Sequence, residues 1–148
     1  MSLRLRKATL DDSYFLFRLR NDSQVRTMSS HTLRIARGQH DAWMNQWLRK
    51  RISDEGLYIA ERRGEGLRIG TGRIERVAGS TQFGAVCMIS YSVGRQYRGN
   101  GYGLKLVSLL VRRAKRMGYD KIYCHIKRQN TASLLCAQRG GVTHVEFF

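Results

Sequence analysis

The chain has 148 residues, 42% of them hydrophobic, and a formal net charge of +16. This length and composition suit one globular domain with a single core, which we place over residues 1–148, and they exclude a disordered chain. No apolar run is long enough to span a membrane, and the Leu–Arg alternation of the first residues is unlike a signal peptide. We therefore expect a cytoplasmic protein without membrane partners.

The basic residues are spread along the whole sequence and indicate an anionic partner. Nucleic acid, anionic lipid and phosphorylated metabolites all fit this charge, so the charge alone does not choose between them. Cys87, Cys124 and Cys136 form no CxxC pair, and the four histidines lack the spacing of metal ligands. We expect free thiols and no metal site.

Hydrophobic periodicity and turn signals predict ten helices and strands. In chain order they are a strand at 3–8, a helix from Thr9 that ends near 21–22, a helix at 41–52, strands at 57–62, 67–77 and 83–93, a helix at 104–117, a strand at 121–127, a helix at 130–139 and a strand at 142–148. Turn residues at 63–66 and 78–80 separate the middle strands. The order βαα-βββ-αβαβ predicts a mixed α/β (α+β) fold with a central sheet and flanking helices.

A glycine-rich turn joins the strand at 83–93 to the helix at 104–117, with the sequence Arg98-Gly99-Asn100-Gly101-Tyr102-Gly103. Its glycines let the backbone approach a ligand closely, and its N–H groups lie at a helix start, where the helix dipole favours an anion. Arg95 and Arg98 add positive charge, so the turn predicts a pyrophosphate site. It lacks the Lys-Ser/Thr of a Walker loop, and the strand at 121–127 lacks the acidic residue of a dinucleotide fingerprint.

Two motifs resemble those of the GNAT family of N-acetyltransferases. Residues 96–101 (QYRGNG) match its Q/R-x-x-G-x-G/A acetyl-CoA signature, with Gly103 in the next small position. Asn130-Thr131-Ala132-Ser133, followed by GGV at 140–142, is similar to its N-x-x-S/A…G-F segment. The resemblance covers nearly the whole chain. It implies acetyl-CoA as co-substrate and a central, mostly antiparallel sheet with splayed strands, here without the further strand that the family usually has after the last one.

The resemblance also implies where acetyl-CoA binds. The thioester would lie between the strands at 83–93 and 121–127, which splay apart. Backbone groups of Tyr91, Ser92 and Val93 would bond the pantetheine arm and polarise the thioester carbonyl. Amides of residues 98–103 would hold the pyrophosphate, and Asn130 and Ser133 would lie beside the pantetheine, with Ser133 a further candidate for catalysis.

The residues that could transfer protons depart from the family's usual pattern. The family often has a tyrosine seven residues after the asparagine, where it protonates the leaving thiolate, but this position is Ala137. The adjacent Cys136 is interpreted as a small core residue. An amine nucleophile needs a base, and the candidates are His125, His40 and Glu75. His125 points away from the apolar face of its strand and could reach the site, or it could be a buried, satisfied histidine, whereas Glu75 lies among arginines and suits an ion pair. The carboxylate position common in the family corresponds to Met88.

The N-terminal region resembles a pattern R-N-D-x-x-V-R…S…H-x-x-W, which occurs in the branch acetylating nucleotide-linked amino sugars, as in pseudaminic acid pathways. Asn21, His40 and Trp43 would then bind the sugar, although they also suit a helix cap, a helix start and a core aromatic. Enzymes acetylating ribosomal-protein N-termini share similar helices and are an alternative. A non-catalytic nucleic-acid-binding domain is an alternative of another class, which predicts aromatics on one sheet face. We expect a small anionic substrate rather than nucleic acid, and a homodimer is one way to complete the sheet edge.

Overall fold

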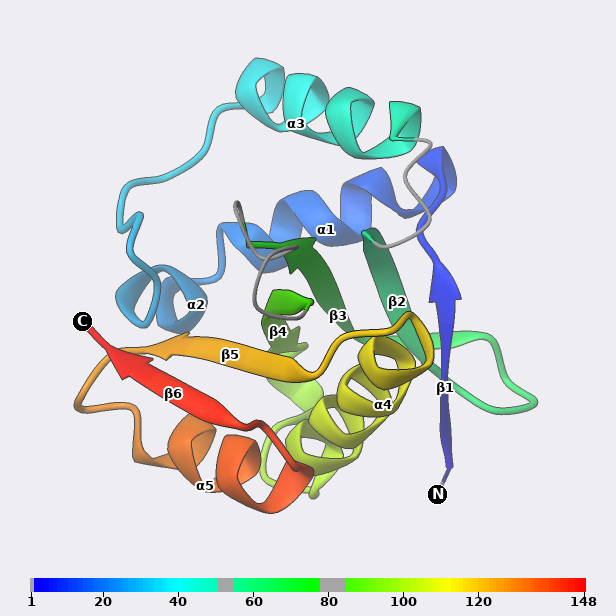
Figure 1. Cartoon of the computed structure of the whole chain (residues 1–148). Helices are drawn as coiled ribbons and strands as arrows, with labels where there is room; N and C mark the ends of the chain where they lie inside the picture. The colour runs from blue at the N-terminus through cyan, green and yellow to red at the C-terminus, as the bar shows by residue number, and fades with distance from the viewer. Residues whose placement is uncertain (1, 51–54, 78–84) are drawn as a thin grey trace.

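The computed structural model describes residues 2–50, 55–77 and 85–148, and within these ranges the chain forms six strands and five α-helices. Figure 1 shows their arrangement. The elements are β1 (Leu3–Lys7), the 3-10 turn η1 (Leu10–Asp12), α1 (Ser13–Arg20), α2 (Ser23–Thr27), α3 (Arg37–Arg49), β2 (Gly56–Arg62), β3 (Leu67–Arg76), β4 (Val86–Val93), the 3-10 turn η3 (Arg95–Tyr97), α4 (Tyr102–Arg116), β5 (Lys121–Ile126), α5 (Thr131–Gly140) and β6 (His144–Phe147).

The six strands form one mixed sheet in the order β1-β2-β3-β4-β5-β6. The pairs β1–β2, β2–β3 and β3–β4 are antiparallel, whereas β4–β5 and β5–β6 are parallel. Each parallel connection contains a helix, α4 or α5, as a parallel crossover requires. This single α/β domain confirms the predicted fold class.

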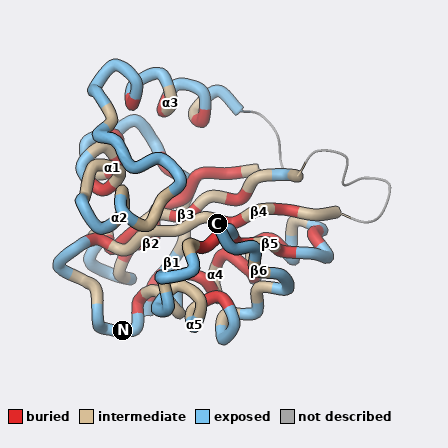
Figure 2. The backbone as a smooth tube through the Cα atoms, turned by 90° about the vertical axis from the view of Figure 1, so that its left-hand side faces the viewer, coloured by how far each residue is buried: buried red, intermediate tan, exposed pale blue. Residues whose placement is uncertain are grey.

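Helices cover both faces of the sheet, α1 and α3 on one side and α4 and α5 on the other (Figure 1). The larger core lies under α4, whose apolar residues recur at helical spacing and include the fully buried Leu106, Val107 and Leu110. A smaller core joins α1 and α3 to β2 and includes Leu16, Met44 and Ile59. In Figure 2 the buried residues lie along the strands of the sheet and in parts of the helices.

The predicted element ends agree with the observed ones to within a few residues, with two exceptions. Helix α3 begins at Arg37, one turn before the predicted start, and the short α2 was not predicted. Asp22 explains α2, because its carboxylate accepts hydrogen bonds from the N–H groups of Gln24 and Val25 and so caps the helix. The predicted helix residues 51–52, strand residues 83–84 and turn residues 78–80 lie outside the described residues.

The described residues contain no helix with the length and apolar content that a bilayer span needs. In the same part of the chain, no three His, Cys, Asp or Glu side chains gather as metal ligands would. All three cysteines are free thiols, as the sequence indicates.

Candidate active site

Strands β4 and β5 separate partway along their length. Their last paired residues are Ile89 and Cys124, although β4 continues to Val93 and β5 to Ile126. We call the diverging segments, residues 90–93 and 125–126, the β4–β5 fork. Backbone groups alternate sides along a strand, so the N–H and C=O of Tyr91 face β5 beyond the last pair. The fork therefore offers backbone hydrogen-bonding groups in the middle of the sheet.

The glycine turn, residues 98–103, presents further backbone donors at the start of α4. Gly99 and Gly101 have φ angles of 79° and 80°, left-handed values that favour glycine. A Cβ added at either position would meet nothing within 4 Å, so this side of the turn is open. Within the described chain, no acceptor binds the backbone N–H groups of residues 99–104. These donors lie at the positive end of the α4 dipole and suit a pyrophosphate.

The side chain of Arg98 turns back from the glycine turn. Its Nε donates to the carbonyl oxygen of Val93 at 3.0 Å, and its two terminal nitrogens lie 2.9 Å from Asp22 Oδ1 and 3.2 Å from Gln24 Oε1. The guanidinium charge is thus used to hold the segment between α1 and α2. The structure therefore does not support the prediction that Arg98 adds free positive charge to the turn. The backbone N–H groups remain as the hydrogen-bond donors for an anion.

Helix α5 brings polar groups to the side of the fork that faces α4. Asn130 Oδ1 accepts a hydrogen bond from the Ser133 N–H at 3.2 Å and caps the helix. The Ser133 hydroxyl lies 2.7 Å from the hydroxyl of Tyr91, which also donates to the Ser133 carbonyl at 3.2 Å. A Cβ at Gly103 would lie 3.2 Å from Cys136 Sγ, so α4 and α5 pack closely here. The structure therefore places Tyr91, Asn130 and Ser133 together.

His125 lies on the opposite face of the fork. Its strand directs Ile122 and Cys124 into the core under α4, so His125 points to the side of α1–α3. Nε2 of His125 is 2.6 Å from Glu146 Oε2 on β6, and both side chains are about half exposed, at 52% and 54%. A carboxylate in this position orients the imidazole as it does in catalytic dyads.

The other two predicted bases are engaged elsewhere. Glu75 lies 3.5 Å from Arg73 in an ion pair. His40 is fully buried; its Nε2 is 2.9 Å from the Ser13 carbonyl, which places the proton on Nε2, and its Nδ1 accepts from Arg20 at 3.0 Å. Burial, and then the charge of Arg20, lowers the pKa of His40, so the ring is neutral near pH 7. His40 therefore orients Arg20.

A basic cluster lies on the α1–α3 face of the sheet. The guanidinium of Arg20 is 4.0 Å above the ring of Trp43, and that of Arg73 is 5.9 Å from the same ring. No described carboxylate forms an ion pair with Arg20. Burial, and then the charge of Arg73, lowers the pKa of Arg20 to about 10. An anion beside this cluster would stabilise the charged form of Arg20.

The remaining residues of the N-terminal R-N-D-x-x-V-R…S…H-x-x-W pattern support the basic cluster but are not part of it. The side chain of Asn21 makes two hydrogen bonds to the backbone of Ile35, at 2.7 and 2.9 Å, and so fixes the loop before α3. Ser29 donates to the carbonyl of Val25. Of the three predicted substrate residues, Trp43 therefore lies in the basic cluster, His40 supports it, and Asn21 holds the surrounding loop.

Sequence reasoning missed the side-chain roles of Arg20, Arg73 and Tyr91. Arg20 begins the R-N-D pattern, but its lack of a carboxylate partner depends on tertiary packing. Arg73 alternates with the buried Gly72 and Ile74 on β3, a pattern that places it on the outer face. Tyr91 shares a face with Ile89, and this alternation could have placed its hydroxyl beside α5.

Comparison with known proteins agrees with this fold. Residues 2–143 match the protein-family model of the acetyltransferase (GNAT) domain. No curated protein sequence matches the chain. Among solved structures, spermidine N-acetyltransferase from Vibrio cholerae, in complex with CoA and spermine, superposes with a TM-score of 0.80 at 15% identity over 95% of this chain and 80% of that chain.

Two further structures have similar folds. Ribosomal-protein-alanine N-acetyltransferase from Brucella melitensis has a TM-score of 0.76 at 22% identity, covering 93% of this chain and 83% of that chain. The aminoglycoside acetyltransferase AAC(6')-Ib with coenzyme A has a TM-score of 0.74 at 22% identity, covering 95% and 83%.

The family match spans almost the entire chain, and the fold agrees with it. The chain therefore belongs to the GNAT acetyltransferase-domain family. It is an N-acetyltransferase that uses acetyl-CoA.

Proposed function

We propose that the protein transfers an acetyl group from acetyl-CoA to the amine of a nucleotide-linked amino sugar. The observation that carries the acceptor class is the cluster of Arg20, Trp43 and Arg73. Two arginines on one aromatic ring, one of them without a carboxylate partner, suit a ligand that carries phosphate charge and a planar or hydroxylated ring.

In this proposal acetyl-CoA enters from the side of α4 and α5. The N–H groups of residues 99–104 bind its pyrophosphate, and Asn130 and Ser133 lie beside the pantetheine arm. Backbone groups of Tyr91 and Val93 face the thioester in the β4–β5 fork, where a correctly aimed N–H would stabilise the oxyanion. Ser92, the third predicted strand residue, pairs instead with Thr71 of β3.

The acceptor binds on the other face of the sheet. Arg73 pairs with Ser90 across β3 and β4, and His125 lies on the same face at the fork, so the basic cluster and the imidazole share one side. His125, oriented by Glu146, takes the proton of the attacking amine. The amine then adds to the thioester carbonyl to give a tetrahedral intermediate, and alignment of the two substrates supplies much of the rate.

The structure argues against the nucleic-acid alternative. Tyr91 contacts α5, whereas Tyr123 stacks on His144 on the opposite face of β5 with ring centroids 4.7 Å apart. Tyr97 packs edge-on against Tyr102. These tyrosines therefore do not form the common aromatic face that a stacking surface for bases needs. We also keep a cytoplasmic location, where both anionic substrates are available, as part of this proposal.

The acceptor class is tested by measuring CoA release with a panel of UDP-linked amino sugars and ribosomal-protein N-terminal peptides. We expect turnover with a nucleotide-linked sugar and a rise of tenfold or more in its KM in Arg20→Gln, since a charge-assisted hydrogen bond is lost. Arg18→Gln, an exposed arginine on the same helix, is the control and should leave KM unchanged. Preference for the peptides, or equal KM values for both variants, would contradict the acceptor assignment.

The cofactor site is tested separately by thermal shift with acetyl-CoA. Gly101→Asp should abolish stabilisation by acetyl-CoA, because it adds a negative charge among the pyrophosphate donors. Gly64→Asp is a matched control in the β2–β3 hairpin: its φ is 83° and a Cβ there also meets nothing within 4 Å. The control carries the same backbone strain and charge, so equal loss in both variants would reject the proposed pyrophosphate site.

A further inference from the structure

We propose that the phenol of Tyr91 is the acid that protonates the departing CoA thiolate, and that Ser133 positions it. The inference rests on the proposed location of the thioester in the β4–β5 fork, but not on the identity of the acceptor. It assigns a proton donor to a reaction for which α5 has Ala137 at the position where the family often has a tyrosine.

The position of Tyr91 follows from the strand. Residues Ile89 and Tyr91 share the face of β4 that meets α4 and α5, and Ile89 is the last residue paired with β5. Tyr91 is therefore the first residue of the fork whose side chain points to the cofactor side. Its hydroxyl ends 2.7 Å from Ser133 Oγ, beside the capped start of α5.

Ser133 holds the phenol at a fixed point. Its N–H donates to Asn130, which caps the start of α5. Its hydroxyl can donate to the Tyr91 oxygen while its carbonyl accepts from the same phenol. When a thiolate arrives, the phenol proton can turn from the Ser133 carbonyl to sulfur. The Ser133 hydroxyl then remains to stabilise the phenolate.

The environment keeps the phenol protonated until it is needed. Burial raises the pKa of Tyr91, because a phenolate is poorly solvated there, and the titratable groups that face it are the thiols of Cys124 and Cys136 rather than charged side chains. Cys124 is a weaker candidate, because it is buried in the core and its thiol already donates to the Ile89 carbonyl. Ala137 is fully buried and has no polar group.

The step balances as follows. The tetrahedral intermediate collapses, the C–S bond breaks, and its electron pair goes to sulfur. The Tyr91 O–H proton moves to that sulfur and gives free CoA thiol. The phenolate recovers a proton through solvent, equal to the one that the amine nitrogen has lost, so the enzyme returns to its starting state. The acid and the base, Tyr91 and His125, thus lie on opposite faces of the fork.

The first test needs no acceptor. The thiol of bound CoA is titrated by the ultraviolet absorbance of its thiolate, in the wild type and in Tyr91→Phe. A phenol that donates to sulfur stabilises the thiolate, so we expect the bound thiol to titrate about one pH unit higher in Tyr91→Phe. Tyr123→Phe removes a hydroxyl on the other face of β5 and should match the wild type. Identical titrations for Tyr91→Phe and the wild type would overturn the proposal.

The second test is kinetic, with whichever amine the acceptor panel identifies. Tyr91→Phe should lower kcat by about 100-fold, within the range of general acid catalysis, and change the KM for acetyl-CoA less than about twofold. A raised KM with unchanged kcat would mean that Tyr91 only shapes the cofactor site. Ser133→Ala, which keeps the phenol, should lower kcat by less than Tyr91→Phe and gives a second reading if Tyr91→Phe folds poorly. If no nucleotide sugar reacts, the acceptor proposal fails, while the CoA titration still decides on Tyr91.

Discussion

The carboxylate of Asp22 lies 2.9 Å from the guanidinium of Arg98, although the two residues are 76 positions apart. Asp22 caps α2 beside the acceptor region, and Arg98 begins the glycine turn that we assign to the pyrophosphate. Burial alone would raise the pKa of Asp22, but the Val25 N–H and Arg98 outweigh it and hold the pKa below its usual value. The ion pair thus connects the proposed acceptor site to the proposed acetyl-CoA site.

This pair predicts coupling between the two regions. In a double-mutant cycle of Asp22→Asn and Arg98→Gln, measured by denaturant unfolding, we expect a coupling energy of about 1 kcal/mol, since the pair is partly buried. Both single variants should weaken acetyl-CoA binding by a similar factor, because either one frees the glycine turn. Additive unfolding energies would show that the contact contributes nothing.

The structure also shows which features were accessible from the sequence. The alternation of β4 and the periodicity of α4 follow from local patterns, so the central sheet and the helix after the glycine turn were predicted correctly. The single core that was predicted is instead two clusters, one on each face of the sheet. The partners of Arg98 and Arg20 were not, because an arginine is paired or unpaired only through residues that the fold brings from elsewhere. Asp22 pairs with Arg98, whereas Arg20 meets only a neutral histidine and an aromatic ring.

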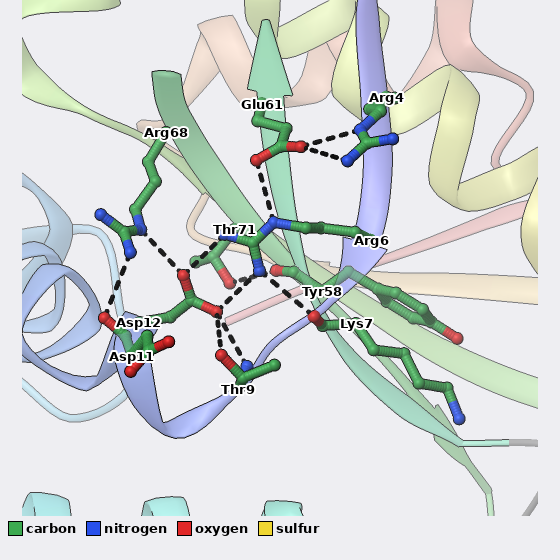
Figure 3. A network of polar contacts seen from close by, with 10 residues as sticks. All are labelled: Arg4, Arg6, Lys7, Thr9, Asp11, Asp12, Tyr58, Glu61, Arg68 and Thr71. Atoms are coloured by element: carbon green, nitrogen blue, oxygen red, sulfur yellow. Dashed lines mark hydrogen bonds and ion pairs between the residues drawn. The ribbon is translucent and has the colours of Figure 1, made fainter. Parts of the chain in front are cut away.

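A second network stabilises the other end of the sheet (Figure 3). Asp12 is fully buried and accepts from Arg6 at 2.7 and 2.8 Å, from Arg68 at 2.8 Å and from the Thr9 N–H at 2.8 Å. Arg6 also binds Glu61 at 2.9 Å. Removing the carboxylate would take the buried partner from Arg6, which keeps Glu61, and the carboxylate partner from Arg68. Asp12→Asn should therefore lower the free energy of unfolding by about 3 kcal/mol.

The pH dependence of stability tests the same network. Burial would raise the pKa of Asp12, but hydrogen bonds from Arg6, Thr9 and Arg68 outweigh it and hold the pKa well below its usual range. The stabilisation is therefore complete above the unfolded-state pKa of about 4 and is lost as the pH falls below it. Unfolding followed between pH 7 and 2 should show a shallower acid loss in Asp12→Asn. The exposed Asp41→Asn should behave as the wild type, and parallel curves for Asp12→Asn would contradict the assignment.

The proposed base predicts an effect on the rate. His125→Ala should lower kcat/KM by about 100-fold at neutral pH, because no imidazole is left to take the proton of the attacking amine. Glu146→Gln should reduce the rate only severalfold, since an amide still orients the ring with less charge. His144→Ala, another exposed histidine on the adjoining strand, serves as control. Full activity of His125→Ala across the pH range would eliminate this residue as the base.

The close contact between α4 and α5 predicts a steric effect at Gly140. A Cβ at this position would lie 2.5 Å from Val107 Cγ1, so Gly140→Ala must push α5 away from α4. We expect a loss of about 1–3 kcal/mol in the free energy of unfolding and weaker acetyl-CoA binding, since Ser133 moves with α5. Gly38→Ala, a helix position where a Cβ meets nothing within 4 Å, should instead stabilise by about 0.5–1 kcal/mol. Adding Val107→Ala to Gly140→Ala should restore acetyl-CoA affinity, because it makes room for the new methyl group. If affinity did not recover, the contact between residues 140 and 107 would not determine the position of α5.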